Sequence, residues 1–157
     1  MTFSQLLKWP GRCCANEGLI MPVDPLQNLV IRRMNALGDW LDKYEYLIGL
    51  GDRLPPMDPS LRTEDRLING CQTQVWIDAR LVDGRMRFQG DCDAKITRGV
   101  LALILSLVDG RTPAHVAKME MYCLQETRLM DSLSPSRLGG VGAMIQRLHE
   151  IAVSLCD

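Results

Sequence analysis

The sequence has almost no net charge. Its 18 Lys and Arg residues balance 19 Asp and Glu residues, which leaves a formal charge of -1 at pH 7. No basic run is longer than Arg32-Arg33. Proteins that bind nucleic acids usually carry a basic excess because they neutralise phosphates. We therefore expect no nucleic-acid partner.

Long apolar runs are also missing. The longest, Val100 to Val108, is interrupted by Ser106 and falls far short of the roughly 20 residues that span a bilayer. Residues 1–18 lack the apolar segment of a secretory signal. A transit peptide stays open as an alternative because acidic residues are sparse before Glu17, although the segment is short for one. We expect a cytoplasmic protein with no membrane partner.

Metal-ligand spacings are absent as well. The chain has only two histidines, and none of its six cysteines form a C-x-x-C pair. A chain of this size without an export signal is expected to keep its thiols reduced. We therefore predict no resident metal ion and no cofactor. The cysteines are Cys13, Cys14, Cys71, Cys92, Cys123 and Cys156.

The first half of the chain predicts an extension and two helices. Residues 1–22 have no sustained period and are expected to be a loosely ordered extension, followed by a single domain over 23–157. Asp24 and Pro25 are typical of a helix start. Asp39 caps a second predicted helix, which we expect Gly49 and Gly51 to end.

The apolar period then changes from helical spacing to alternation. Val75 to Leu81 alternates as in a half-buried strand, and Val82-Asp83-Gly84 predicts a hairpin turn into a second strand. Arg66 to Ile68 is a candidate third strand. The region 94–108 predicts a central buried helix, capped by Asp91 or Asp93.

Two further helices are expected near the C-terminus: a short one that starts with Thr112 as its cap and Pro113 as its first residue, and a last one that Ser134-Pro135 precedes. Helices therefore precede and follow the strands in the chain. This order predicts the α+β class, with a small antiparallel sheet of about three strands flanked by helices.

Cys71 is the strongest candidate for chemistry. It follows Gly70, which allows an unusual backbone turn, and it lies at a loop between two strand-like segments. Single cysteines are most often small buried hydrophobes, and we interpret Cys123 and Cys156 in that way. The local sequence alone leaves a reactive and a structural Cys71 equally open.

Several runs of the chain resemble the SufE-type sulfur acceptor proteins of the SUF iron–sulfur assembly pathway. The resemblance extends from about residue 24 to the C-terminus. The runs that carry it are Tyr44-Glu45-Tyr46-Leu47-Ile48-Gly49-Leu50-Gly51, Leu54-Pro55, Gly70-Cys71-Gln72-Thr73-Gln74-Val75-Trp76, Gly90-Asp91-Cys92-Asp93-Ala94 and Leu133-Ser134-Pro135-Ser136-Arg137.

The resemblance implies a function and a fold. Such proteins stimulate a pyridoxal-phosphate cysteine desulfurase (SufS-type), accept its sulfane sulfur as a persulfide, and pass it to the SUF scaffold complex (SufBCD-type). Cys71 is the persulfide-forming residue that this implies, in an accessory protein without turnover of its own. The implied fold is shared with the IscU-type scaffolds. Two alternatives stay open: an iron–sulfur cluster scaffold and a non-catalytic interaction module.

Sulfur transfer parallels thiol–disulfide exchange, in which only the thiolate attacks. No cation lies next to Cys71 in the sequence, so we expect its activation to depend on a docked partner. A terminal persulfide oxidises easily. We therefore predict that apolar groups partly shelter Cys71 and that its loop moves outward to transfer sulfur.

Cys92 departs from the resemblance, because the family usually has serine there. Either it is a serine-sized replacement, or it is a second thiol that lies near Cys71 if the loop and the strand end meet. Asp91 and Asp93 are interpreted as helix caps rather than general bases. Arg137 is open between binding a charged partner group and a structural role.

Overall fold

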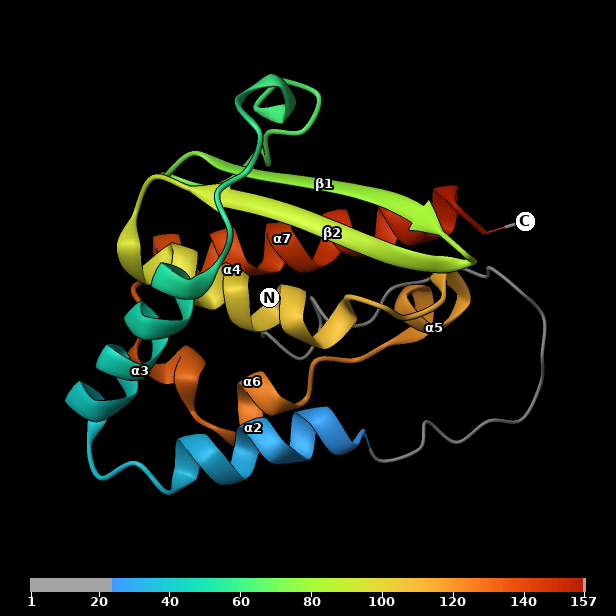
Figure 1. The fold of residues 1–157 in the computed structure, drawn as a ribbon. Coiled ribbons are helices and arrows are strands. Elements are labelled where there is room, and N and C mark those ends of the chain that lie inside the picture. The colour runs from blue at the N-terminus through green and yellow to red at the C-terminus, as the bar shows by residue number, and fades with distance from the viewer. Residues whose placement is uncertain (1–23, 157) are drawn as a thin grey trace.

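The computed structural model describes residues 24–156 and contains helices on both sides of one hairpin in chain order (Figure 1). This arrangement confirms the predicted α+β class. Its elements are α2 (Pro25–Asn35), α3 (Trp40–Arg53), η1 (Pro59–Leu61), β1 (Val75–Val82), β2 (Arg85–Cys92), α4 (Lys95–Val108), α5 (Pro113–Lys118), α6 (Cys123–Glu126), η2 (Leu129–Ser132) and α7 (Pro135–Ser154).

The sheet has two antiparallel strands, in register from Val75 opposite Cys92 to Val82 opposite Arg85. Asp83 and Gly84 both have positive φ, 52° and 76°, which suits the tight turn of a hairpin. The predicted third strand is wrong in extent. It is reduced to a single bridge between Leu67 and Trp76, because the chain leaves a turn just before it and turns again at Gly70.

Helix α4 is the central helix, and most of its side chains are buried, as its sequence predicts. It lies against α3 and β2. The prediction that Gly49 and Gly51 end α3 is wrong, because the helix continues to Arg53. A Cβ on Gly51 would lie 2.8 Å from the backbone nitrogen of Gly99 in α4, so this glycine provides close helix contact rather than a stop.

Three helix caps follow the sequence prediction. Asp24, Asp39 and Thr112 each accept a hydrogen bond from a backbone N–H in the first turn of their helix. The predicted cap of α4 is wrong, since Ala94 occupies the cap position and no side chain caps the helix. Asp91 instead binds two arginines, and Asp93 accepts a hydrogen bond from the N–H of Gln74. The short elements α6 and η2 have no counterpart among the predicted elements.

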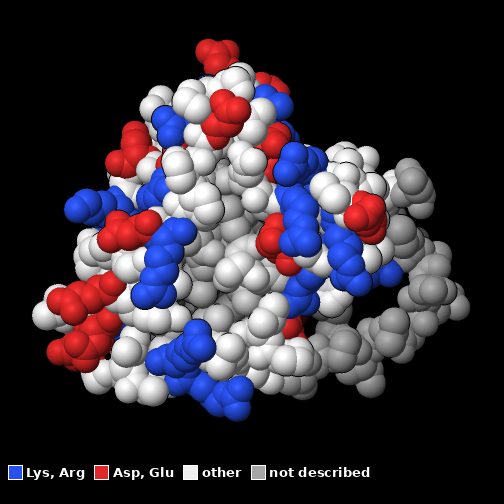
Figure 2. Space-filling view, in the orientation of Figure 1, with Lys and Arg blue, Asp and Glu red and all other residues white. Residues whose placement is uncertain are grey.

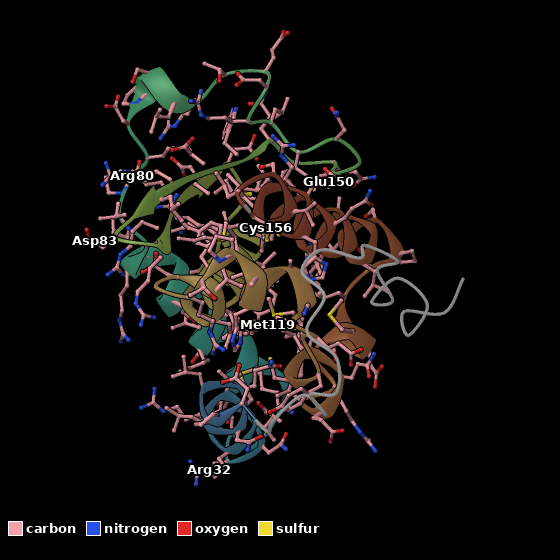
Figure 3. The ribbon with its side chains drawn as sticks, turned by 90° about the vertical axis from the view of Figure 1, so that its right-hand side faces the viewer. Arg32, Arg80, Asp83, Met119, Glu150 and Cys156 are labelled. Atoms are coloured by element: carbon pink, nitrogen blue, oxygen red, sulfur yellow. The ribbon has the colours of Figure 1, made fainter. Side chains whose placement is uncertain are left out.

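The start of β1, the end of β2 and the first turns of α4 and α7 gather at one end of the molecule (Figure 1). The hairpin turn lies at the other end of the strands (Figure 1), and Arg80 and Asp83, labelled in Figure 3, mark it. Figure 2 shows Lys and Arg interspersed with Asp and Glu around an uncharged centre. Charges of both signs therefore lie on this face, and neither sign dominates it.

Within residues 24–156, none of the helices combines the length and the apolar character needed to cross a bilayer. The predicted extension over residues 1–22, with Cys13 and Cys14, lies outside the described residues. The domain boundaries stay a prediction.

Candidate functional site

The Cys71 loop joins the single bridge at Leu67 to the start of β1. Gly70 turns the chain with φ = 94°, a conformation that side chains other than glycine rarely adopt. A Cβ there would meet only the Cβ of Ala143 on α7, at 3.8 Å. The glycine is therefore required by the backbone turn rather than by lack of space, and it directs the next residue toward α7.

The side chain of Cys71 lies against Gly140 of α7, and we call this position of the thiol its seat. The Sγ of Cys71 donates a long hydrogen bond, 3.5 Å, to the carbonyl oxygen of Gly140. A Cβ on Gly140 would lie 3.0 Å from that Sγ, closer than ordinary contacts. Cys71 is half-buried and packs against the hydrophobic core. This position confirms the predicted partial sheltering.

The surroundings of Cys71 disfavour its thiolate. Burial raises its pKa, and the neighbouring Cys92 raises the pKa further. An unperturbed cysteine already has a pKa of about 8.5. The seated thiol is therefore a weak nucleophile at neutral pH, which agrees with the lack of an adjacent cation in the sequence.

The structure brings Cys92 to the Cys71 loop. Cys92 ends β2 opposite Val75 and is 7% exposed. Its Sγ donates to the hydroxyl oxygen of Thr73 at 3.7 Å and accepts from the N–H of Ala94 at 3.5 Å. Of the two alternatives for Cys92, the geometry favours a second thiol beside the site.

Backbone contacts fix the far end of the loop to the same strand end. The N–H of Gln74 donates to Oδ1 of Asp93 at 3.1 Å, and the N–H of Asp93 donates to the carbonyl oxygen of Gln74 at 3.2 Å. Asp93 therefore positions the loop through a backbone group. Within residues 24–156, the hydrogen bonds of the segment from Gly70 to Thr73 are the thiol contacts of Cys71 with Gly140 and of Cys92 with Thr73.

An ion cluster around Asp91 forms the rigid frame of the site. The buried carboxylate of Asp91 binds the guanidinium groups of Arg62 and Arg98. Arg98 also donates to the carbonyl oxygens of Gly51 and Leu54, at 2.8 and 2.7 Å. Sequence reasoning missed both arginines, because neither spacing nor period links them to Asp91.

Two more side chains near this end have clear positions. The guanidinium of Arg62 lies 5.8 Å from the ring centre of Trp76, which makes Trp76 a structural partner of the cluster. Arg137 is exposed near the start of α7, where it lines a small hollow with Val141 and Ile96. In residues 24–156, no group of three or more His, Cys, Asp or Glu side chains is placed to hold a metal ion.

The model of the SufE family, described as an Fe-S metabolism associated domain, matches residues 28–152 of the chain. The chain belongs to the SufE family. Membership places it in iron–sulfur metabolism and confirms the resemblance seen in the sequence. The SufE run around Cys71 is thus part of a match that covers most of the chain.

A solved structure has the same fold. It is the solution structure of a hypothetical protein from Thermus thermophilus. The two chains share 21% sequence identity with a TM-score of 0.71, over 85% of this chain and 97% of the other. At this identity the similarity supports the fold alone.

Proposed function

We propose that this SufE-family protein accepts sulfane sulfur on Cys71 from a pyridoxal-phosphate cysteine desulfurase and passes it to a SUF-type scaffold complex. One observation carries the proposal. Cys71 is a half-buried thiol on a glycine-hinged loop, where it packs against the core and makes one long hydrogen bond to Gly140.

The chemistry requires only a thiolate. The Cys71 thiolate attacks the outer sulfur of the persulfide on the donor cysteine, and a new sulfur–sulfur bond forms on Cys71. The old sulfur–sulfur bond breaks, and the donor cysteine leaves as a thiolate. No oxidant or reductant is consumed. The same exchange in the next step transfers the sulfur onward.

The seat explains how one thiol can be protected and then used. While Cys71 lies on Gly140, burial keeps the pKa of its thiol high, so it reacts slowly with small molecules. A contact between a thiol and a carbonyl oxygen at 3.5 Å is weak, so docking a partner can release it. Outside the seat the thiol loses its burial and its pKa falls toward the ordinary value.

The decisive experiment is sulfur loading in the presence of a SufS-type desulfurase, pyridoxal phosphate and cysteine. Intact mass and peptide mapping should show a reductant-labile gain of one sulfur on Cys71. The Cys71→Ser variant should lose both this adduct and the stimulation of the desulfurase. A Cys71→Ser variant that stimulates normally would contradict the proposal and favour a non-catalytic interaction module.

Cys156→Ser is the matched control for a thiol that plays no part. Cys156, which is labelled in Figure 3, follows the end of α7, whereas Cys71 contacts Gly140 near the start of that helix. At 1.5 Å per residue the two sites are about 20 Å apart along the helix. Cys156→Ser should load sulfur and stimulate the desulfurase as the unmodified chain does.

A further inference from the structure

The Cys71 loop connects the two thiols through Thr73. The hydroxyl of Thr73 contacts the Sγ of Cys92, and Thr73 is two residues from Cys71 in the chain. Two residues of extended chain span at most about 7 Å. A persulfide extends the side chain by a further bond of about 2 Å. The loop therefore keeps Cys71 within two residues of the side chain that contacts the Cys92 thiol, and the two thiols are close enough for Cys92 to raise the pKa of Cys71.

The surroundings of Cys92 suit a sulfur that is stored rather than exposed. Burial raises the pKa of the Cys92 thiol, which keeps it unreactive toward small molecules, while the N–H of Ala94 at the start of α4 donates to its Sγ and partly offsets that rise. Its low exposure keeps a protein partner and solvent oxidants away from it. A donor protein therefore reaches Cys92 only by way of Cys71.

We infer that Cys92 is a second sulfur acceptor, which takes the sulfane sulfur from Cys71 within the same chain and holds it as a buried persulfide. This inference rests on the proposed function of Cys71. It gives the chain a capacity of two sulfur atoms, because Cys71 is free to be loaded again after the internal transfer.

The internal step balances without another reactant. The Cys92 thiolate attacks the outer sulfur of the Cys71 persulfide, and a sulfur–sulfur bond forms on Cys92. The bond between the Sγ of Cys71 and the outer sulfur breaks, and its electron pair stays on Cys71. The proton lost by Cys92 passes to the Cys71 thiolate. No electrons are gained or lost overall.

The test is sulfur loading by a SufS-type desulfurase with excess cysteine, followed by intact mass and peptide mapping. We expect up to two reductant-labile sulfur atoms on the unmodified chain, one mapping to Cys71 and one to Cys92. Cys92→Ser should carry one, on Cys71. Cys71→Ser should carry none, because Cys92 is loaded only through Cys71.

Thr73→Val is a second variant, which keeps the side-chain shape and leaves both thiols in place. It removes the hydroxyl that contacts Cys92, so the second sulfur should arrive about fivefold more slowly. Loading of the first sulfur on Cys71 should be unchanged. The folding control for Cys92→Ser is its stimulation of the desulfurase, which should equal that of the unmodified chain.

Three results would overturn the inference while leaving the function of Cys71 intact. The first is loading of only Cys71 in the unmodified chain, with the same mass gain as Cys92→Ser. The second is sulfur on Cys92 in Cys71→Ser, which means direct loading. The third is a Cys71–Cys92 disulfide with release of sulfide, which means attack on the inner sulfur. Absence of sulfur from Cys71 in every variant would overturn the proposed function and this inference together.

Discussion

Gly99 in α4 and Gly140 in α7 both let another part of the chain approach more closely than a side chain allows. At Gly99 the approaching atom is the backbone oxygen of Leu47, which an added Cβ would meet at 2.1 Å. At Gly140 it is the Sγ of Cys71, at 3.0 Å. One glycine therefore faces the backbone of a helix, and the other faces the end of a side chain on a loop.

The difference separates a fixed contact from a releasable one. The Leu47 oxygen cannot move without displacing α3, whose own hydrogen bonds hold it in place. The thiol of Cys71 can leave by rotation of its side chain or movement of its loop. The first contact thus determines how α3 and α4 pack, and the second provides a seat that the functional thiol can vacate.

Gly99→Ala should give the largest effect. The added methyl must displace the backbone of α3, so we expect the free energy of unfolding to fall by about 3 kcal/mol or more. Urea denaturation measures this change. Gly49→Ala in α3 is the control, because no atom lies within 4 Å of its Cβ position and alanine favours helices. Equal free energies of unfolding for Gly99→Ala and Gly49→Ala would mean that the contact at Gly99 is not the fixed one that determines how α3 and α4 pack.

Asp91→Asn tests whether the frame beside the loop is as rigid as the packing at Gly99. The change leaves Arg98 and Arg62 without their carboxylate, and we expect a loss of about 2 kcal/mol because Arg62 is partly exposed. Denaturation curves check this value. Glu150→Gln, on the surface of α7 and paired with Arg147, should change stability by less than about 0.5 kcal/mol (Figure 3).

Gly140→Ala should separate reactivity from stability. Alanine gains helix propensity but crowds the Cys71 thiol, so the free energy of unfolding should change by less than about 1 kcal/mol. Loss of the seat should raise the alkylation rate of Cys71 by iodoacetamide about fivefold, which equals about 1 kcal/mol of seat stability. An unchanged alkylation rate would show that Gly140 does not hold the thiol.

The pH dependence of Cys71 alkylation should show the smallest effect. It further tests whether the contact of Cys71 with Gly140 is releasable, in contrast to the fixed contact at Gly99. Because burial raises the pKa of Cys71, its alkylation midpoint should lie above that of a free cysteine and move downward in Gly140→Ala. The stability from seating the neutral thiol is present below the unfolded pKa and is lost as pH rises through the folded pKa. Loop release is therefore favoured in alkali.

Cys123 provides an internal reference in that experiment. It is fully buried, and burial raises its pKa to about 12. Peptide mapping should find it unmodified at every pH at which the protein stays folded. Modification of Cys123 in parallel with Cys71 would mean that global unfolding, and not loop release, controls the reaction.

Much of the local structure follows from the sequence. The caps at Asp24, Asp39 and Thr112 and the hairpin turn at Asp83-Gly84 depend on neighbouring residues only, so they are predictable. The end of α3 is not predictable in this way, because Gly51 has the local pattern of a helix stop although the helix continues past it. Glycine is needed at position 51 because α3 contacts α4 there, and α4 lies far away in the chain.

The site divides in the same way. The neighbours of Cys71 in the chain identify it as the candidate, and persulfide chemistry predicts the sheltering of its thiol. The seat at Gly140 and the pairing of Asp91 with Arg62 and Arg98 could not be predicted. Each of these contacts joins segments whose positions depend on how the helices pack.

The α+β class, the loop that carries Cys71 and the family all follow from the order of residues alone, because alternation, turn residues and a contiguous motif are local properties of the chain. The seating of the thiol on Gly140 and the position of Cys92 beside the loop depend on packing. Those distances arise when α7 and the end of β2 converge on the loop, and no pattern along the chain encodes that convergence.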